Sequence, residues 1–156
     1  MSYQFSKPLG LWLAVALIAG VFSLPVQAGE PASGPEITVY KSPTCGCCTG
    51  WVDYLKDNNF RVTAHNVDNL DQIRAKHGLK DPKLRSCHTA IVDGYVVEGH
   101  VPVDDIKRLL TERPKVIGIS APGMPQMSPG MMSIEPKDYD VVSFDADGKV
   151  EVFSRY

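Results

Sequence analysis

The segment Cys45-Gly46-Cys47-Cys48 constrains the fold more than any other part of the chain. The run 37–40 before it is β-rich, and Trp51, Tyr54 and Leu55 after it have the i, i+3, i+4 spacing of an amphipathic helix. The cysteines are therefore predicted to lie where a strand passes into a helix. There the unpaired N–H groups and the positive end of the helix dipole favour thiolate over thiol.

The remaining elements are predicted from periodicity and turn signals. Further strands are expected over 61–67, 89–92, 95–98, 141–144 and 150–153, and Asp93-Gly94 is a strong hairpin signal. Helices are expected to follow Asp68 or Asn69 and to follow Pro102, while residues 115–137, rich in Gly, Pro and Met, are expected to form a loop. The order predicts an α/β fold, a mixed sheet with flanking helices and a C-terminal hairpin.

The first 28 residues have the order of a secretory signal peptide. Lys7 is their only charge, an apolar stretch occupies residues 11–22, and Val26-Gln27-Ala28 is a small-x-small cleavage pattern. A membrane anchor is the competing interpretation, but the apolar stretch is shorter than the ~20 residues that a spanning helix needs. Export to the periplasm is therefore predicted, with no membrane attachment once the signal is removed.

Three segments follow from this assignment: a signal peptide (1–28), a polar Pro/Gly linker (29–36) and one domain (37–156). The chain has 16 basic and 18 acidic residues without a basic run, which excludes nucleic acid as an expected partner.

The chain has four cysteines, and the fourth, Cys87, stands beside His88. An exported protein with four cysteines can simply have two structural disulfides. Crowded cysteines serve that role poorly, because a bridge between neighbours closes a short loop and removes little entropy from the unfolded chain. A chemical site is the alternative, provided that the two cysteine segments meet.

The position of Cys45-Gly46-Cys47-Cys48 resembles that of the Cys-x-x-Cys motif in the thioredoxin superfamily. In that superfamily the loop entering the third strand lies against the dithiol, and here that loop carries Cys87 and His88 before Thr89. The superfamily usually has a cis-proline where this chain has His88. This departure disfavours ordinary disulfide exchange and favours a metal site.

Soft thiolates select Cu(I), zinc or iron–sulfur clusters. Structural zinc sites usually use two separated cysteine pairs, whereas three cysteines in four residues suit sulfurs that bridge several ions. Met124 and Met127 belong to the Met-rich segment 123–132, which holds four of the five methionines. Thioethers suit Cu(I), although Met side chains covering the core are an alternative. His65 and His77 are assigned to a strand and a helix end, and His100 is a weaker candidate than His88.

The leader, Cys-Gly-Cys-Cys, Cys-His and Gly-Met-Pro-x-Met-Ser-Pro-Gly-Met together resemble the CopG-type copper-resistance proteins, small periplasmic members of the thioredoxin superfamily. The resemblance covers Ile37 to about Phe153. It implies a thioredoxin-like fold, a cysteine-bridged cluster of several copper ions and a role in copper tolerance. The ligands expected on this basis are Cys45, Cys47, Cys48, Cys87, His88, Met124 and Met127.

The leading hypothesis is a periplasmic copper-binding protein whose partners are copper ions and other copper-handling proteins of the periplasm. Mixed sulfur and nitrogen ligation is compatible with Cu(I)/Cu(II) cycling by a copper-dependent oxidoreductase and equally with sequestration. Two alternatives stay open: a thiol–disulfide oxidoreductase using Cys45 and Cys48, and a structural protein stabilised by disulfides.

Overall fold

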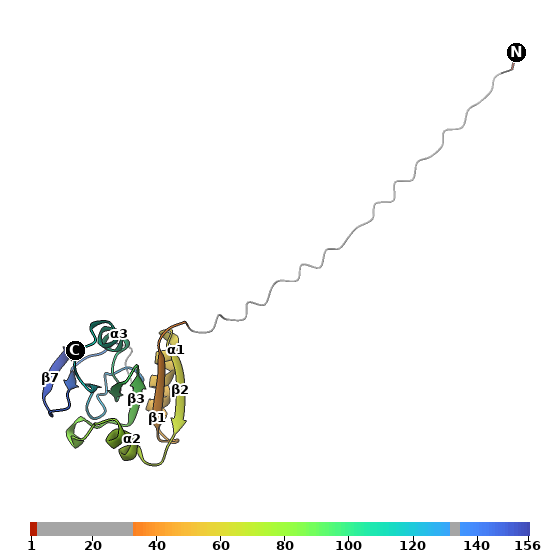
Figure 1. Cartoon of the computed structure of the whole chain (residues 1–156). Helices are drawn as coiled ribbons and strands as arrows, with labels where there is room; N and C mark the ends of the chain where they lie inside the picture. Colours follow the sequence, from red (N-terminus) through yellow and green to blue (C-terminus); the bar gives the residue numbers. More distant parts are fainter. Residues whose placement is uncertain (3–32, 132–134) are drawn as a thin grey trace.

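The computed structural model describes residues 1–2, 33–131 and 135–156 (Figure 1). Residues 3–28 of the predicted signal peptide and the first half of the predicted linker (29–32) lie outside these residues, as does Met132. No helix within the described ranges is long and apolar enough to cross a membrane.

The described chain alternates strands and helices in nearly the predicted order. The strands are β1 (Glu36–Lys41), β2 (Arg61–Asn66), β3 (His88–Val92), β4 (Tyr95–Glu98), β5 (Gly118–Ser120), β6 (Asp140–Phe144) and β7 (Val150–Arg155). The helices are α1 (Gly46–Asp57), α2 (Leu70–Lys76), α3 (Val103–Glu112) and the short 3-10 helix η1 (Pro82–Leu84). The N-cap of α2 is Asn69, whose side chain accepts from Asp71 N, and β1 includes Glu36, the last residue of the predicted linker.

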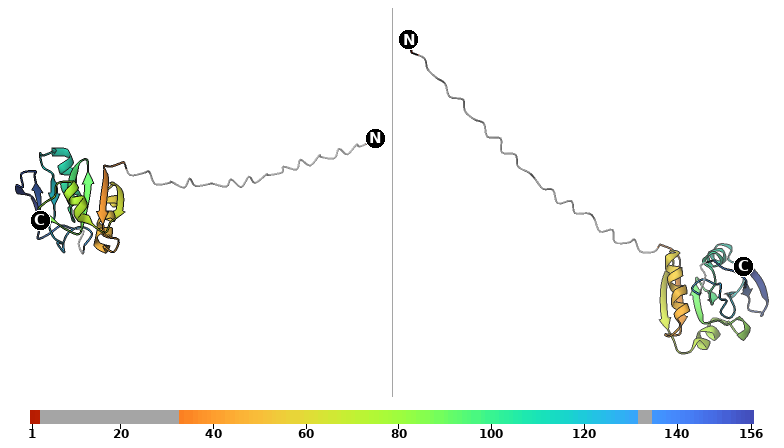
Figure 2. Two further views of the ribbon diagram at one scale, coloured as in Figure 1. Left: turned by 60° about the horizontal axis from the view of Figure 1, so that its bottom comes forward. Right: turned by 180° about the vertical axis from the view of Figure 1, so that it is seen from behind.

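The seven strands of the described residues form one mixed sheet in the order β2-β1-β3-β4-β5-β6-β7 (Figures 1 and 2). β1 is parallel to β2 and antiparallel to β3, and β3 is antiparallel to β4. A β–α–β crossover followed by an antiparallel pair confirms the predicted thioredoxin-like mixed sheet.

The two faces of this sheet are covered by different helices. On one face the main core joins α1 and α3 to the strands, with Trp51 and Leu55 of α1 and Ile106 and Leu109 of α3 fully buried. On the other face a smaller cluster holds Leu79, which follows α2, together with other buried side chains, namely Leu84, Val96 and Phe144. The 3.6-residue spacing of apolar side chains explains why α1 and α3 each bury one stripe.

β5 was not predicted, because it lies within residues 115–137, which the sequence analysis assigned to a loop. It has three residues, all buried, and runs parallel to β4 with Val97 opposite Ile119. A Cβ on Gly118 would lie 2.0 Å from Val96 O, so glycine permits the close approach of the two strands. β5 joins the C-terminal β6–β7 hairpin to the same sheet.

The β3–β4 turn sets the register on which the site depends. Asp93 and Gly94 have φ of 47° and 86°, as a type I′ turn requires. The hairpin therefore pairs Thr89 with Glu98, and Gly99 N donates to His88 O at 3.0 Å. Residues just after β4 thus lie beside those just before β3.

Candidate metal centre

The first turn of α1 carries three of the four cysteines. Cys45 is the N-cap, in extended backbone geometry, and its Sγ accepts from Cys48 N at 3.3 Å. A sulfur in this position occupies the place of the oxygen that usually satisfies the unpaired N–H groups at a helix start. Local helix geometry thus gathers Cys45, Cys47 and Cys48 at one end of α1.

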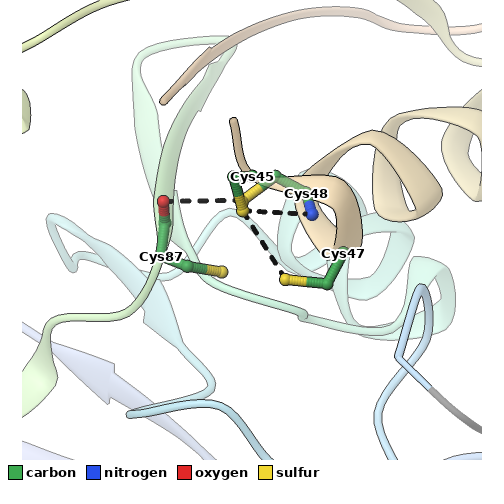
Figure 3. Close-up of side chains that lie close together, drawn as sticks. All are labelled: Cys45, Cys47, Cys48 and Cys87. Carbon is green, nitrogen blue, oxygen red and sulfur yellow. Dashed lines mark hydrogen bonds between the residues drawn. A yellow bond between two sulfur atoms is a disulfide. The ribbon is translucent and has the colours of Figure 1, made fainter. Parts of the chain in front are cut away.

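Cys87 completes a group of four sulfurs. It lies in the loop that enters β3, and its side chain points toward that of Cys47 (Figure 3). The Sγ atoms of Cys45, Cys47, Cys48 and Cys87 all lie within 4.8 Å of one another, and Cys45 Sγ is 3.5 Å from Cys47 Sγ. The two cysteine segments therefore meet in space.

Cys45 and Cys48 form a disulfide, and Cys47 and Cys87 are free. The structural alternative with two disulfides is therefore wrong on the number of bridges. The one bridge that is present spans a sequence separation of three residues and constrains the unfolded chain little. Since the thiolate is the metal ligand, binding through all four sulfurs requires the reduced Cys45–Cys48 pair.

Two buried histidines extend the site from Cys87. His88 Nδ1 lies 3.4 Å and His100 Nε2 lies 3.1 Å from Cys87 Sγ, and both imidazoles are fully buried. Cys87, His88 and His100 form a second group whose ligand atoms are within 4.8 Å of one another. Cys87 belongs to both groups, so it connects the sulfur site to the imidazoles.

His100 is a site residue that the sequence analysis did not select. The hairpin register could have found it: continuing the pairing two residues beyond the Thr89–Glu98 pair places His100 opposite Cys87. His100 Nδ1 lies 2.7 Å from Pro129 O, which can only accept, so Nδ1 carries the hydrogen. Its Nε2 lone pair is thereby directed at Cys87, as in histidines prepared for a metal.

Burial determines the protonation of these groups. Burial, reinforced by His100, holds the pKa of His88 well below its usual value, and burial also lowers the pKa of His100. Both imidazoles are therefore neutral and have a nitrogen lone pair available. Burial, followed by the nearby charge of Cys47, raises the pKa of Cys87 to about 12, so a metal must displace its proton.

His88 is held between two rings. Its ring centroid is 4.3 Å from that of Trp51 and 5.0 Å from that of His100. The His88 Nε2 atom is buried and has no hydrogen-bond partner among the described residues. The nitrogen of His88 that faces Cys87 is Nδ1, so Nδ1 is the ligand atom that this position offers, and Nε2 is the nitrogen left without a partner.

The segment that carries the methionines passes along the site. Gly123 N donates to Arg85 O at 3.0 Å, Ser86 and Gly123 form a parallel bridge, and Pro129 contacts His100. Met124 and Met127 on this segment are 56% and 39% exposed. Their thioethers are surface groups in this structure, and their role as ligands stays a prediction.

Gly130 anchors this segment to α1, and its replacement gives a test of that contact. Its φ is +81°, and an added Cβ would lie 2.5 Å from Trp51 N. Gly148 has φ +83° with nothing within 4 Å of the added Cβ, so it is a matched control. Gly148→Ala is expected to lose about 1–2 kcal/mol of unfolding free energy from the left-handed backbone alone. Gly130→Ala is expected to lose about 1–3 kcal/mol more through steric overlap, measured by urea unfolding. Equal losses would contradict the contact.

Two family models match this chain, and each covers one half of the site. A glutaredoxin family model matches residues 37–80, and a model described as "Protein of unknown function, DUF411" matches residues 84–131. The first match contains the cysteines of α1, and the second contains Cys87, both buried histidines and the methionine segment as far as Met131. No curated protein matches the chain.

Two solved structures are similar to most of the chain. A structure described as "Copper resistance protein copG- Form 1" is 38% identical with a TM-score of 0.72, over 79% of this chain and 98% of that one. Form 2 is also 38% identical with a TM-score of 0.72, over 78% of this chain and 98% of that one.

Proposed function

Because this chain belongs to the CopG family of copper resistance proteins, we propose that it binds copper in the periplasm and contributes to copper resistance. The ligands of the proposed site are the four cysteine sulfurs, the two buried imidazoles and the methionine thioethers. The observation that carries this proposal is the convergence of four sulfurs within 4.8 Å, with Cys87 shared by the imidazole group.

The chemistry of this donor set fits copper. Thiolate and thioether are soft ligands, and neutral imidazole binds both Cu(I) and Cu(II). Three sulfurs from four consecutive residues surround one ion poorly but are well placed to bridge several. Cys87, which belongs to both the sulfur group and the imidazole group, is a natural bridging ligand. A multinuclear copper cluster is therefore the form that we propose, and its mixed ligands are compatible with Cu(I)/Cu(II) redox activity.

Exposed thioethers suggest how copper reaches the buried ligands. Met124 and Met127 lie on a segment that contacts both the Cys87 loop and His100, yet their side chains face solvent. A neutral soft ligand at the surface can accept Cu(I) from another copper-handling protein of the periplasm without a proton being displaced. The sulfurs of α1 and Cys87 then bind it.

The test is anaerobic titration of the reduced protein with Cu(I), followed by desalting and elemental analysis. More than one copper ion per chain is expected to be retained, with short copper–copper scattering in X-ray absorption. Cys47→Ser is expected to reduce the retained copper, because it removes one of the proposed bridging sulfurs. A simple redox pair of Cys45 and Cys48 does not need this sulfur, so the variant distinguishes the two functions. Thr49→Ala, in the next position but one of the same helix, is the control. Copper-free wild type after desalting would overturn the proposal.

A second candidate function is thiol–disulfide exchange, which the Cys45–Cys48 disulfide at the head of α1 favours. In such a reaction a substrate thiolate attacks one sulfur of the bridge, and the second sulfur leaves as thiolate. The position of the methionine segment argues against a protein substrate. Gly123 pairs with Arg85 and Ser86, so this segment lies against the loop that a protein substrate would have to contact beside the disulfide. Insulin reduction that survives Cys47→Ser and Cys87→Ser, without copper retention, would favour this candidate.

A further inference from the structure

Glu98, the last residue of β4, is a fully buried carboxylate whose hydrogen bonds are all made by the surroundings of Cys87. Its Oε1 accepts from Ser86 N at 2.7 Å and from Arg74 Nε and Nη2 at 3.0 and 2.7 Å. Its Oε2 accepts from Thr89 Oγ1 at 2.6 Å. These partners come from α2, from the residue before Cys87 and from β3.

Arg74 reaches the same peptide from α2. Its side chain is only 7% exposed, and Nη2 donates to Ser86 O at 2.7 Å as well as to Glu98. The N–H of Ser86 therefore bonds to Glu98, and its C=O bonds to Arg74. Both backbone polar groups of the residue before Cys87 are fixed by one buried ion pair.

A buried ion pair is a poor source of net stability. Removing two charges from water costs several kcal/mol per ion, and an apolar pair of similar volume is often as stable. An ion pair whose hydrogen bonds are all satisfied does, however, hold its partners in a defined geometry. The described residues contain no cis peptide bond, so the loop before β3 is not shaped by the cis-proline usual in the thioredoxin superfamily.

We propose that Arg74 and Glu98 are positioning residues that hold the Ser86–Cys87 peptide so that Cys87 faces the sulfurs of α1 and His100 together. This inference rests on the proposed copper function. A small displacement of Cys87 would break these contacts, because its Sγ lies 3.1 Å from His100 Nε2 and within 4.8 Å of the three sulfurs of α1. A side-chain pair thus takes over the role of the missing proline.

Glu98→Gln tests this inference with Asp105→Asn as a matched control. Asp105 is also a buried carboxylate beside an arginine, but its partners Arg108, Ser154 and Tyr156 lie on α3 and at the C-terminal end of the chain. Both substitutions remove the charge of a buried carboxylate that pairs with an arginine, and both are expected to destabilise the fold. Only Glu98→Gln is expected to weaken copper retention, by about 10–100-fold in chelator competition, and to shift the copper–sulfur absorption bands.

A readout without copper separates this inference from the proposed function. The rate at which a thiol reagent modifies Cys87 in the metal-free protein, followed by peptide mass spectrometry, is expected to rise in Glu98→Gln and to stay unchanged in Asp105→Asn. Arg74→Lys, which keeps the charge but loses the planar fork, should behave like Glu98→Gln and serves if that variant does not fold.

The outcomes are distinct. Wild-type protein that retains no copper overturns the proposed function, while a faster reaction of Cys87 still supports the positioning role. Unchanged copper spectra and unchanged Cys87 reactivity in both Glu98→Gln and Arg74→Lys overturn the positioning role, whatever the wild type binds. Equal effects of Asp105→Asn on Cys87 would also overturn it, because general destabilisation would then be the cause.

Discussion

Cys87→Ser is expected to cause the largest loss of copper binding of any single substitution in this protein. Cys87 is the one residue in both groups of convergent ligand atoms, the four sulfurs and the Cys87–His88–His100 set. Its removal disconnects the imidazoles from the α1 sulfurs, whereas Cys47→Ser leaves them connected. Copper affinity in chelator competition is expected to fall by more than about 100-fold, the upper end of what loss of a supporting residue costs.

Two histidine substitutions serve as comparisons for this prediction. His77→Gln, at the C-cap of α2, removes an imidazole outside the site and should leave copper binding unchanged. His100→Gln should give an intermediate loss, because it removes one nitrogen without opening the sulfur group. A Cys87→Ser protein that retains the wild-type amount of copper would mean that the ligands do not share this residue.

Trp51→Ala is expected to cause the largest loss of stability. Trp51 is fully buried in the main core, donates from Nε1 to Val101 O at 2.9 Å and packs against His88. Truncation of a buried tryptophan costs about 3–5 kcal/mol through lost burial and the cavity left behind. Since small domains are stable by about 5–15 kcal/mol, this is a large fraction of the total, measurable by urea unfolding.

Trp51→Phe distinguishes the contribution of the aromatic ring from that of the Nε1 hydrogen bond. It keeps an aromatic ring beside His88 but leaves Val101 O without its donor, at a cost of about 1–3 kcal/mol. We expect this variant to bind copper with near wild-type affinity, while Trp51→Ala binds less tightly because His88 loses one of the rings that hold it. If Trp51→Ala unfolds with wild-type free energy, Trp51 is not the core residue that its burial indicates.

Metal binding and protonation are opposed at this site. Burial favours the neutral imidazoles and the protonated Cys87 thiol in the metal-free protein. A bound cation reverses the preference of Cys87 for the protonated thiol, because coordination requires the thiolate and releases its proton. Burial therefore keeps the histidines ready to bind and leaves Cys87 inert until a metal arrives.

Local sequence patterns were sufficient for most of the fold. A β-rich run, cysteines at a helix start and apolar residues at 3.6-residue spacing predicted β1, α1 and their junction. Asp93-Gly94 predicted the β3–β4 hairpin because both residues must adopt positive φ. The meeting of Cys87 with the α1 cysteines was implied by the resemblance to the thioredoxin superfamily, in which the loop entering the third strand lies against the dithiol. The strand–helix junction and the hairpin each depend on residues close together in the chain.

Other features of the site were decided by contacts between distant segments. β5 is too short and too rich in small residues to have a pattern of its own, and it forms because β4 and β6 satisfy its backbone groups on both sides. His100 joined the site through strand register and through Pro129, which is 29 residues away.

The sequence by itself determined the family, the α/β class and the cysteine cluster at the head of α1. Only the tertiary structure decided that His100 faces Cys87, that the methionine segment passes along the site, and that Arg74 and Glu98 fix the Ser86 peptide. The physical reason is that buried polar groups must find hydrogen-bond partners wherever the fold supplies them. Those partners come from segments far apart in the sequence, so no local pattern predicts their contacts.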